Sequence, residues 1–284
     1  MRIPLLCFYN TLLVLGLFSC KKDKLKAQKA SFLVINNVFV NTAAAQGSNS
    51  HKITDIWYYV NNQFKGIYPI GKLMPIVAEK SANIKLFAGI KNNGISDTRL
   101  PYEFYEGNEF NINIEEGETY PISADFKYSS NAIFYYSENF DSSIGGSIFS
   151  STGDSAFSNT KDFDASKSFG GKGGSIFMSM NDNKPTAKLL QTAPYFIPSG
   201  GTTVYLELNY KSNQSFIVGV IGGGTEEREA LIVNPSSEWN KIYIQLTKVI
   251  SQQPTYSNYH VYIKAVKTVS VPQIYIDNIK LLSS

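Results

Sequence analysis

The chain has 284 residues, enough for two domains of ordinary size that each bury a hydrophobic core. Charged residues make up 17% and Tyr and Phe number 18 each, so the composition excludes a disordered chain and is typical of aromatic-rich β structure. The formal net charge of +3 comes without a basic stripe of interleaved aromatics, which argues against a nucleic-acid partner.

The chain begins with the three-part layout of a secretory signal peptide. Arg2 supplies one positive charge, residues 5–18 form an apolar body, and Ser19 is the small residue before Cys20. The apolar body is shorter than the roughly 20 residues that a membrane-spanning helix needs. We therefore expect residues 1–19 to be a signal peptide rather than a permanent span.

The end of this segment, Leu17-Phe18-Ser19-Cys20, resembles the lipobox of bacterial lipoproteins. The resemblance implies that signal peptidase II cuts before Cys20, which then carries diacylglyceryl and a further acyl chain such as palmitate. It also implies anchoring in the outer membrane of a Gram-negative cell. The alternative is an ordinary signal peptide with a chance cysteine.

The residues that follow bear on location and on disulfides. Lys21-Lys22-Asp23 resembles the charged tripeptides that direct some lipoproteins to the cell surface. Residues 20–30 are polar and unpatterned, which indicates a flexible tether. Cys7 lies inside the signal, so Cys20 has no partner for a disulfide.

Residues 31–128 have the pattern of a small β-sandwich. We expect strands at residues 31–40, 53–60, 64–68, 83–90, 109–114 and 120–126. Asn61-Asn62 predicts a tight hairpin turn, because Asn tolerates positive φ angles. No helical period of useful length intervenes, and the strand count fits an immunoglobulin-like or a transthyretin-like sandwich.

Residues 129–284 form a second predicted unit, with the boundary near Ser129 or Ser130. Residues 137–175 are rich in Ser, Gly, Asp and Asn. Strands are then expected at residues 175–180, 203–210, 216–221, 241–246, 260–266 and 273–281. These longer strands, separated by Gly and Pro turns, predict a larger sandwich and an all-β protein.

Four segments of this second unit resemble jelly-roll carbohydrate-binding modules and galactose-binding-like domains. They are Glu138-Asn-Phe-Asp141, Gly170 to Met178, Trp239 to Leu246, and Ile274-Tyr-Ile-Asp-Asn-Ile-Lys-Leu281. In that family an opening Glu-x-Phe strand lies beside a closing Ile-Asp-Asn-Ile strand. The resemblance implies a jelly roll and a polysaccharide ligand, although its motifs are loose and none names the sugar.

Aromatic residues are the candidate sugar platforms, because a pyranose ring stacks its C–H face on an aromatic ring. Trp239 either serves in this way or packs beneath a loop at the start of its strand. Four tyrosines of predicted loops and edges are further candidates, each of which also fits ordinary sheet packing: Tyr195, Tyr210, Tyr256 and Tyr259.

Three carboxylates suggest a structural calcium ion. If the first and last strands of the jelly roll pair, Glu138, Asp141 and Asp277 approach one another, and hard oxygen ligands suit Ca²⁺. The alternative is that Asp277 binds backbone groups and the other two are solvated, since Ca²⁺ needs six or more oxygens. No other cofactor is expected.

Catalytic motifs receive no support from the sequence. Glu226 to Glu229 supply dense carboxylates, but they follow Gly222-Gly-Gly224 and are predicted to be a solvated hairpin tip. Gly170 to Gly174 lacks the order of a phosphate-binding loop, and no serine lies in a Gly-x-Ser-x-Gly elbow. His51 and His260 have no acidic neighbour at metal-ligand spacing.

These observations favour a non-catalytic lipoprotein of the cell envelope, anchored in the outer membrane and exposed at the cell surface. The first sandwich is expected to be a spacer and the jelly roll to bind a polysaccharide. Two alternatives remain. One is a structural or adhesion lipoprotein that binds other envelope proteins, and the other is a lectin-fold glycoside hydrolase.

Overall fold

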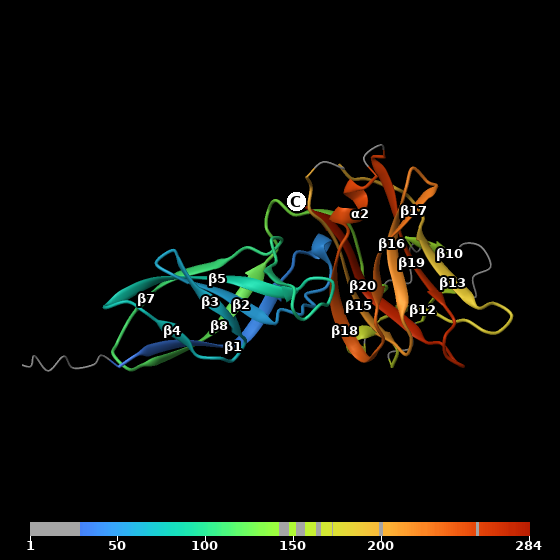
Figure 1. Ribbon diagram of the computed structural model, residues 1–284. Coiled ribbons are helices and arrows are strands. Elements are labelled where there is room, and N and C mark those ends of the chain that lie inside the picture. Colours follow the sequence, from blue (N-terminus) through green and yellow to red (C-terminus); the bar gives the residue numbers. More distant parts are fainter. Residues whose placement is uncertain are drawn as a thin grey trace, which may run out of the picture.

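The computed structural model describes residues 29–141, 148–151, 157–162, 166–171, 173–198, 201–253 and 256–284. Two β-sandwiches lie side by side, and the first packs against one sheet of the second (Figure 1). The predicted signal peptide, Cys20 and most of the tether lie outside the described residues. Within these ranges no helix has the length and apolar character that crossing a membrane requires.

The first sandwich consists of a three-stranded and a five-stranded sheet. The smaller sheet contains β4 (Met74–Ile76), β1 (Ser31–Asn41) and β8 (Thr119–Lys127) in that order. The larger contains β3 (Gln63–Pro69), β2 (Asp55–Val60), β5 (Ser81–Lys91) and β6 (Arg99–Pro101), with β7 (Asn108–Asn113) also paired to β5. β1 is antiparallel to β4 and parallel to β8. The first and last strands of this sandwich, β1 and β8, are therefore neighbours in one sheet.

The predicted hairpin is confirmed. Asn61 and Asn62 join β2 to β3 with φ angles of 50° and 63°, the positive values that a two-residue hairpin turn requires. Every second residue of β5 faces the core, where Ile84 and Leu86 are fully buried. The alternating sequence pattern therefore translates directly into this sandwich.

The second sandwich has two six-stranded sheets. The junction sheet, named for its contact with the first sandwich, contains β11 (Phe157–Asp162), β12 (Ser175–Met178), β20 (Ile274–Ser283), β15 (Val204–Ser212) and β18 (Ser236–Gln245), with β9 (Ile133–Glu138) beside β20. The distal sheet contains β10 (Phe149–Ser151), β13 (Thr186–Gln191), β19 (Asn258–Val266), β16 (Phe216–Gly222) and β17 (Glu226–Val233), with β14 (Tyr195–Phe196) beside β19. Short helical turns lie at η2 (Ala44–Gln46), η3 (Phe169–Gly171) and α2 (Thr247–Ser251).

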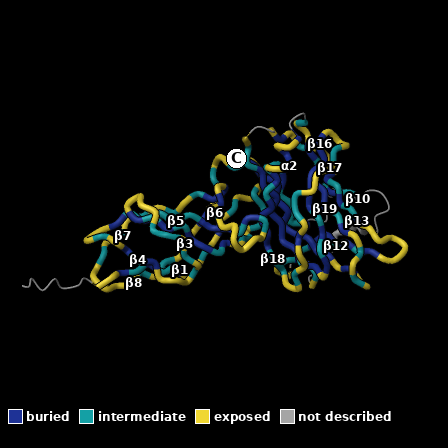
Figure 2. The backbone as a smooth tube through the Cα atoms, in the orientation of Figure 1, coloured by how far each residue is buried: buried dark blue, intermediate teal, exposed yellow. Residues whose placement is uncertain are grey.

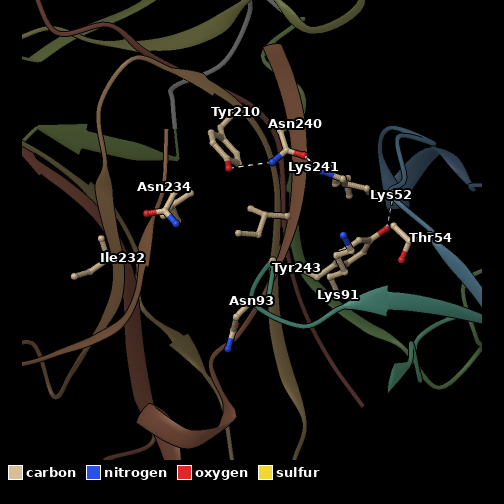
Figure 3. A pocket seen from close by; sticks show the side chains of 13 residues that line it. Lys52, Thr54, Lys91, Asn93, Tyr210, Ile232, Asn234, Asn240, Lys241 and Tyr243 are labelled. Carbon is tan, nitrogen blue, oxygen red and sulfur yellow. Dashed lines mark hydrogen bonds between the residues drawn. The ribbon is translucent and has the colours of Figure 1, made fainter. Parts of the chain in front are cut away.

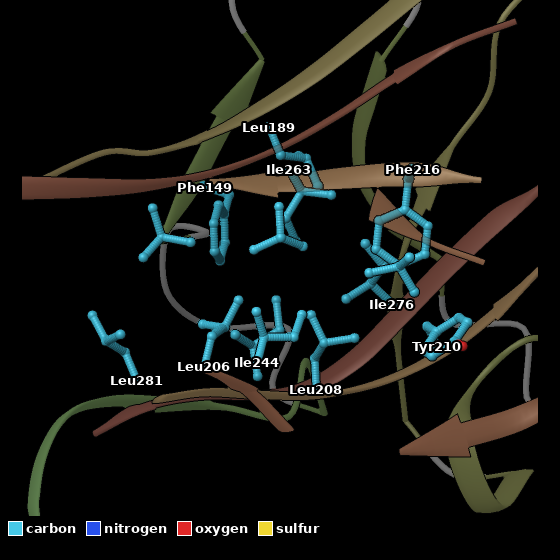
Figure 4. Packing of buried hydrophobic residues seen from close by; sticks show 14 of the residues in the cluster. Phe149, Leu189, Leu206, Leu208, Tyr210, Phe216, Ile244, Ile263, Ile276 and Leu281 are labelled. Carbon is cyan, nitrogen blue, oxygen red and sulfur yellow. The ribbon is translucent and has the colours of Figure 1, made fainter. Parts of the chain in front are cut away.

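Side chains from the two sheets of the second sandwich meet in one hydrophobic core (Figure 4). Leu206, Leu208 and Ile244 face it from the junction sheet, while Leu189 and Ile263 face it from the distal sheet. All five are fully buried, as expected where alternate residues of two stacked sheets interdigitate. The prediction of an all-β protein built from two sandwiches is confirmed.

The sequence prediction was only partly right at β17. Glu226 to Glu229 were expected at a solvated hairpin tip, and the hairpin and the exposure of residues 227–229 are confirmed. The turn itself is made by Gly222 to Thr225, however, and the four residues begin the strand. A register shift between Val218 and Gly219 accommodates the pairing with β16. The strand was missed because charged residues, which are uncommon in strands, are tolerated on an exposed face when they are paired.

The first sandwich covers part of the outward face of the junction sheet. Tyr205, Tyr243 and Leu282 of that sheet belong to the same hydrophobic cluster as the core of the first sandwich. The loop after β5 also lies along the edge strand β18, where Asn93 donates its backbone N–H to the carbonyl of Tyr243 at 2.9 Å. Figure 2 shows that the strands of the second sandwich are mostly buried, whereas the far end of the first is largely exposed.

Candidate functional site

A buried charge cluster fixes the junction between the sandwiches. The carboxylate of Glu207, fully buried on β15, lies 2.7 Å from the ammonium of Lys241 on β18. From the first sandwich, the hydroxyls of Tyr102 and Tyr128 donate to the same carboxylate at 2.8 and 2.9 Å. Lys280 completes the cluster by donating to Tyr128 and to a backbone carbonyl of the first sandwich.

The electrostatics of this cluster are those of a closed structural element. Burial favours the neutral form of Glu207, but Lys241, Lys280 and the hydrogen bonds outweigh it and hold the pKa of Glu207 below its ordinary value. Burial lowers the pKa of Lys280 to about 7, with Glu207 and Lys241 acting in opposite directions. The carboxylate of Glu207 is therefore held by groups from both sandwiches, as expected of a structural contact, while the ammonium of Lys241 has this ion pair but no further hydrogen bond from the described residues.

Beside the cluster the same face opens into a hollow of about 250 Å³, which we name the Trp239 hollow. Its walls are formed by Ser50, His51, Lys52, Phe169, Asn209, Trp239, Asn240 and Lys241. Trp239 stands at the edge strand β18, half-buried, and meets the ring of Phe169 edge-on with centroids 5.9 Å apart. The indole of Trp239, a candidate sugar platform, is therefore fixed by its contact with Phe169 at the wall of the hollow.

An unpaired amide lies in the Trp239 hollow. The side chain of Asn209 is 1% exposed, and its Oδ1 accepts no hydrogen bond from any described residue. A buried acceptor without a partner costs free energy, on the order of 1–3 kcal/mol. Such a group is a candidate for contact with a ligand or an ordered water.

A second hollow of about 140 Å³, the lysine hollow, adjoins the first and shares Lys52, Asn240 and Lys241 with it (Figure 3). It reaches further between the sandwiches, to Lys91 and Asn93 of the first and to Asn234 of the second. Asn240 links the two hollows: its amide donates to the hydroxyl of Tyr210 at 3.0 Å and accepts a hydrogen bond from Lys52. We call the two together the junction groove.

The structure brings two of the five predicted aromatic residues to this groove. Trp239 lines one hollow, and Tyr210, whose ring lies in the core, lines the other. Tyr259 is fully buried, and its hydroxyl bonds the carbonyl of Gln253 at 2.8 Å. It therefore presents no ring face to a ligand.

The other two tyrosines lie around Tyr259 at the distal sheet. Tyr195 of β14 is the register partner of Tyr259 and packs against Tyr136, with ring centroids 5.4 Å apart. The ring of Tyr256 lies against Gly223, where an added Cβ would come within 2.4 Å of it. These three tyrosines form no common surface with Trp239.

The three predicted calcium ligands lie near one another. β9 pairs with β20 as the resemblance implied, and the charges of Asp141 and Glu138 are felt at Asp277. Each carboxylate already accepts a local hydrogen bond. Asp277 binds the N–H of Phe169 at 2.9 Å, and Glu138 binds that of Phe140 at 2.8 Å.

Burial is the main reason why the pKa of Asp277 rises to about 7. Among the described residues no group of three His, Cys, Asp or Glu side chains is arranged to hold a metal ion. The three carboxylates thus have the proximity but not the arrangement of a cation site, and calcium stays a prediction.

On the outward face of the distal sheet, charged side chains cover the aromatic ring of Tyr262. Lys188 and Lys264 place their ammonium groups 4.8 and 5.5 Å from the ring centre of Tyr262, which is fully buried. Glu227 pairs with both lysines, at 2.7 and 3.0 Å, and Glu229 pairs with Lys264. The charges balance and the ring is shielded, so this face lacks the open aromatic surface found at Trp239.

Sequence reasoning missed Lys52, Lys91, Asn209 and Phe169. Asn209 follows Tyr205 and Glu207 at the two-residue spacing that puts all three on one face of β15, a signal that was available. Nothing in the pattern showed that the first sandwich would pack beside that face. The lysines of the first sandwich could therefore not be assigned to a groove with Trp239.

No family model matches this chain, and no curated protein matches it either. Solved structures with a similar fold include a family 29 carbohydrate-binding module, 12% identical, which covers 54% of this chain and 89% of its own, with a TM-score of 0.38. Others are two variants of that family's modules, complexed with mannohexaose (12% identical, 54% and 92% covered, TM-score 0.38) and with cellulohexaose (11%, 54% and 93%, 0.37). These values describe a distant likeness in fold.

Proposed function

We propose that this chain is a non-catalytic glycan-binding protein of the cell envelope, and that the Trp239 hollow is its binding site. The observation that carries the proposal is a half-buried indole in one hollow with the unpaired buried amide oxygen of Asn209 and the ammonium of Lys52. A sugar ring stacks its C–H face on an indole, while its hydroxyls need donors and acceptors nearby. The hollow offers both kinds of contact.

Location is a further part of the proposal. A lipid on Cys20 would anchor the chain in the outer membrane, and two or three acyl chains suffice for stable anchoring. The position of β1 supports a spacer role for the first sandwich, because this strand begins at the end remote from the junction (Figure 1). The junction groove would then stand away from the membrane, where polysaccharide is accessible.

A glycan array probed with the purified protein tests the proposed function, followed by calorimetry on each bound glycan. Trp239→Ala should weaken binding about tenfold or more, equivalent to roughly 1.4 kcal/mol, because the stacking surface is lost. Trp57→Ala is the matched control, since Trp57 is also half-buried but lies on β2 and packs against Phe64. Its affinity should equal that of the unchanged protein.

Two results would count against the proposal. Absence of binding to plant, host and bacterial glycans would remove the glycan-binding function. Equal loss in both tryptophan variants would show that the indole of Trp239 has no special role. For the location, Cys20→Ser should abolish membrane fractionation and labelling with palmitate, and retention of both would overturn the lipid anchor.

A further inference from the structure

The lysine hollow has positive charge that its own walls do not neutralise. Lys52 and Lys91 both line it, and the described residues that form its lining include no Asp or Glu. The third lysine, Lys241, is already paired with Glu207 at 2.7 Å. The hydrogen bonds from the other two ammonium groups go to neutral oxygens of Asn240 and Ser96.

The charge of Lys91 acts on the ammonium of Lys52. Burial lowers the pKa of Lys52, and the charge of Lys91 lowers it further. Two like charges in a partly desolvated recess repel one another, so an anion placed between them gains attraction from both. The positive charge of the lysine hollow therefore favours the binding of a negatively charged group.

The geometry of the hollow is fixed before any ligand arrives. Asn93 donates its backbone N–H to Tyr243 at 2.9 Å and accepts the N–H of Gln245 at the same distance. The backbone N–H of Lys52 donates to the hydroxyl of Tyr243 at 3.0 Å. Both segments that present the lysines are thus tied to the edge strand, and little ordering is needed on binding.

The polar lining around the lysines suits a sugar rather than a bare ion. Asn93, Asn234 and Asn240 make the lining polar, although the side-chain oxygens of Asn93 and Asn240 already accept hydrogen bonds from Gln245 and Lys52. The hollow opens beside Trp239 through the shared residues Lys52 and Asn240. A volume of about 140 Å³ is below the roughly 300–1,000 Å³ of a typical ligand pocket. It fits one substituent or one ring, with the rest of a chain outside.

We propose that the lysine hollow binds an anionic group carried by a sugar residue, while that residue or its neighbour lies against Trp239. This inference rests on the proposed function and narrows its ligand to acidic glycans. Lys52 and Lys91 are the residues that recognise the charge, and Asn93, Asn234 and Asn240 contact ring hydroxyls.

The test measures the affinity of the full protein for polygalacturonate, alginate and hyaluronan, each beside its methyl-esterified form. At least one acidic polymer should bind tenfold or more tightly than its ester, and rising salt should reduce the difference. Lys91→Met should reduce the difference severalfold, because Lys52 alone then remains to attract the anion. Lys80→Met is the control, because Lys80 is exposed at the remote end of the first sandwich.

To learn whether the bound anionic group is a carboxylate or a sulfate, the affinity is also measured for chondroitin sulfate and for its desulfated form. A Lys91-dependent preference for the sulfated form supports an anion site that accepts either group, and a preference restricted to the uronates supports a carboxylate. Equal binding of acid and ester, or an unchanged preference in Lys91→Met, overturns the inference. If Trp239→Ala still weakens glycan binding tenfold or more in that case, the glycan-binding function stands without the anion site.

Discussion

The outward face of the junction sheet has two neighbouring regions with similar residues and different roles. Under the first sandwich, the buried carboxylate of Glu207 accepts hydrogen bonds from Tyr102 and Tyr128 and pairs with Lys241. A short way along the same strands, Asn209 and Trp239 face the Trp239 hollow, where the amide oxygen has no partner. The two regions thus contain similar residue types, and the proposed binding site differs from the structural cluster in having a buried amide oxygen without a partner beside an aromatic ring.

The difference has an energetic meaning. In the region under the first sandwich, removal of one charged side chain leaves its partner as an uncompensated buried charge. Such a substitution should therefore lower the free energy of unfolding. In the Trp239 hollow, the amide oxygen of Asn209 has no hydrogen bond within the protein. Its removal should therefore lower ligand affinity more than it lowers stability. The predictions below test this division, from the largest expected effect to the smallest.

Glu207→Gln should have the largest effect on stability. The substitution keeps the volume of the side chain but leaves Lys241 buried without its counterion, which costs ~3–5 kcal/mol. Urea unfolding followed by tyrosine and tryptophan fluorescence measures the loss. Glu238→Gln, on the exposed part of β18, should change stability by less than ~0.5 kcal/mol. A Glu207 variant as stable as that control would contradict a structural role for the cluster.

Tyr102→Phe should have the next largest effect. It removes one hydrogen bond to the buried carboxylate, and bonds to charged groups contribute about 1.5–3 kcal/mol. The free energy of unfolding from urea denaturation is again the measurement. Tyr59→Phe serves as the control, since the hydroxyl of Tyr59 on β2 takes part in none of the hydrogen bonds of the junction. If the two variants lose equal stability, the bond from Tyr102 contributes nothing.

Stability should also depend on pH through Lys280. Its pKa in the folded protein, about 7, lies below the ordinary value of 10.5, so the unfolded chain binds more protons between these values. Stability therefore rises with pH between about 7 and 10.5, by no more than ~1.4 kcal/mol per unit, and this gain is lost again as the pH falls from 10.5 back to 7.

Lys280→Met should remove that rise, which unfolding curves from pH 7 to 10 would detect. Asp277 titrates in a different window, since its pKa is raised from 3.8 to about 7. It weakens the fold as pH increases from about 4 to 7 and is therefore separable from Lys280. A slope above pH 7 that persists in Lys280→Met would assign the effect to another group.

The sequence predicted those features that depend on neighbouring residues in the chain, and not those that depend on contacts between distant segments. Local alternation and the Asn61-Asn62 turn predicted the strands of the first sandwich, because these depend on neighbours in the chain. Trp239 was named as a platform from its residue type and its place before an alternating run. Its hollow, however, depends on His51 and Lys52 of the other sandwich, and contact between surfaces distant in the chain leaves no periodic pattern.

The smallest effect on stability is expected for Asn209→Ala, and it gives the sharpest test of the comparison. Asn213, a few residues further along, bonds Val271 and Gln273 at 2.8 Å each, so Asn213→Ala should cost roughly 1–2 kcal/mol and leave glycan affinity unchanged. Asn209→Ala should cost less than ~0.5 kcal/mol because its amide oxygen has no bond to lose. Its glycan affinity should nevertheless fall severalfold in calorimetry. If Asn209→Ala destabilises the fold as much as Asn213→Ala and leaves affinity unchanged, the Trp239 hollow is structural too, and the division between the two regions fails.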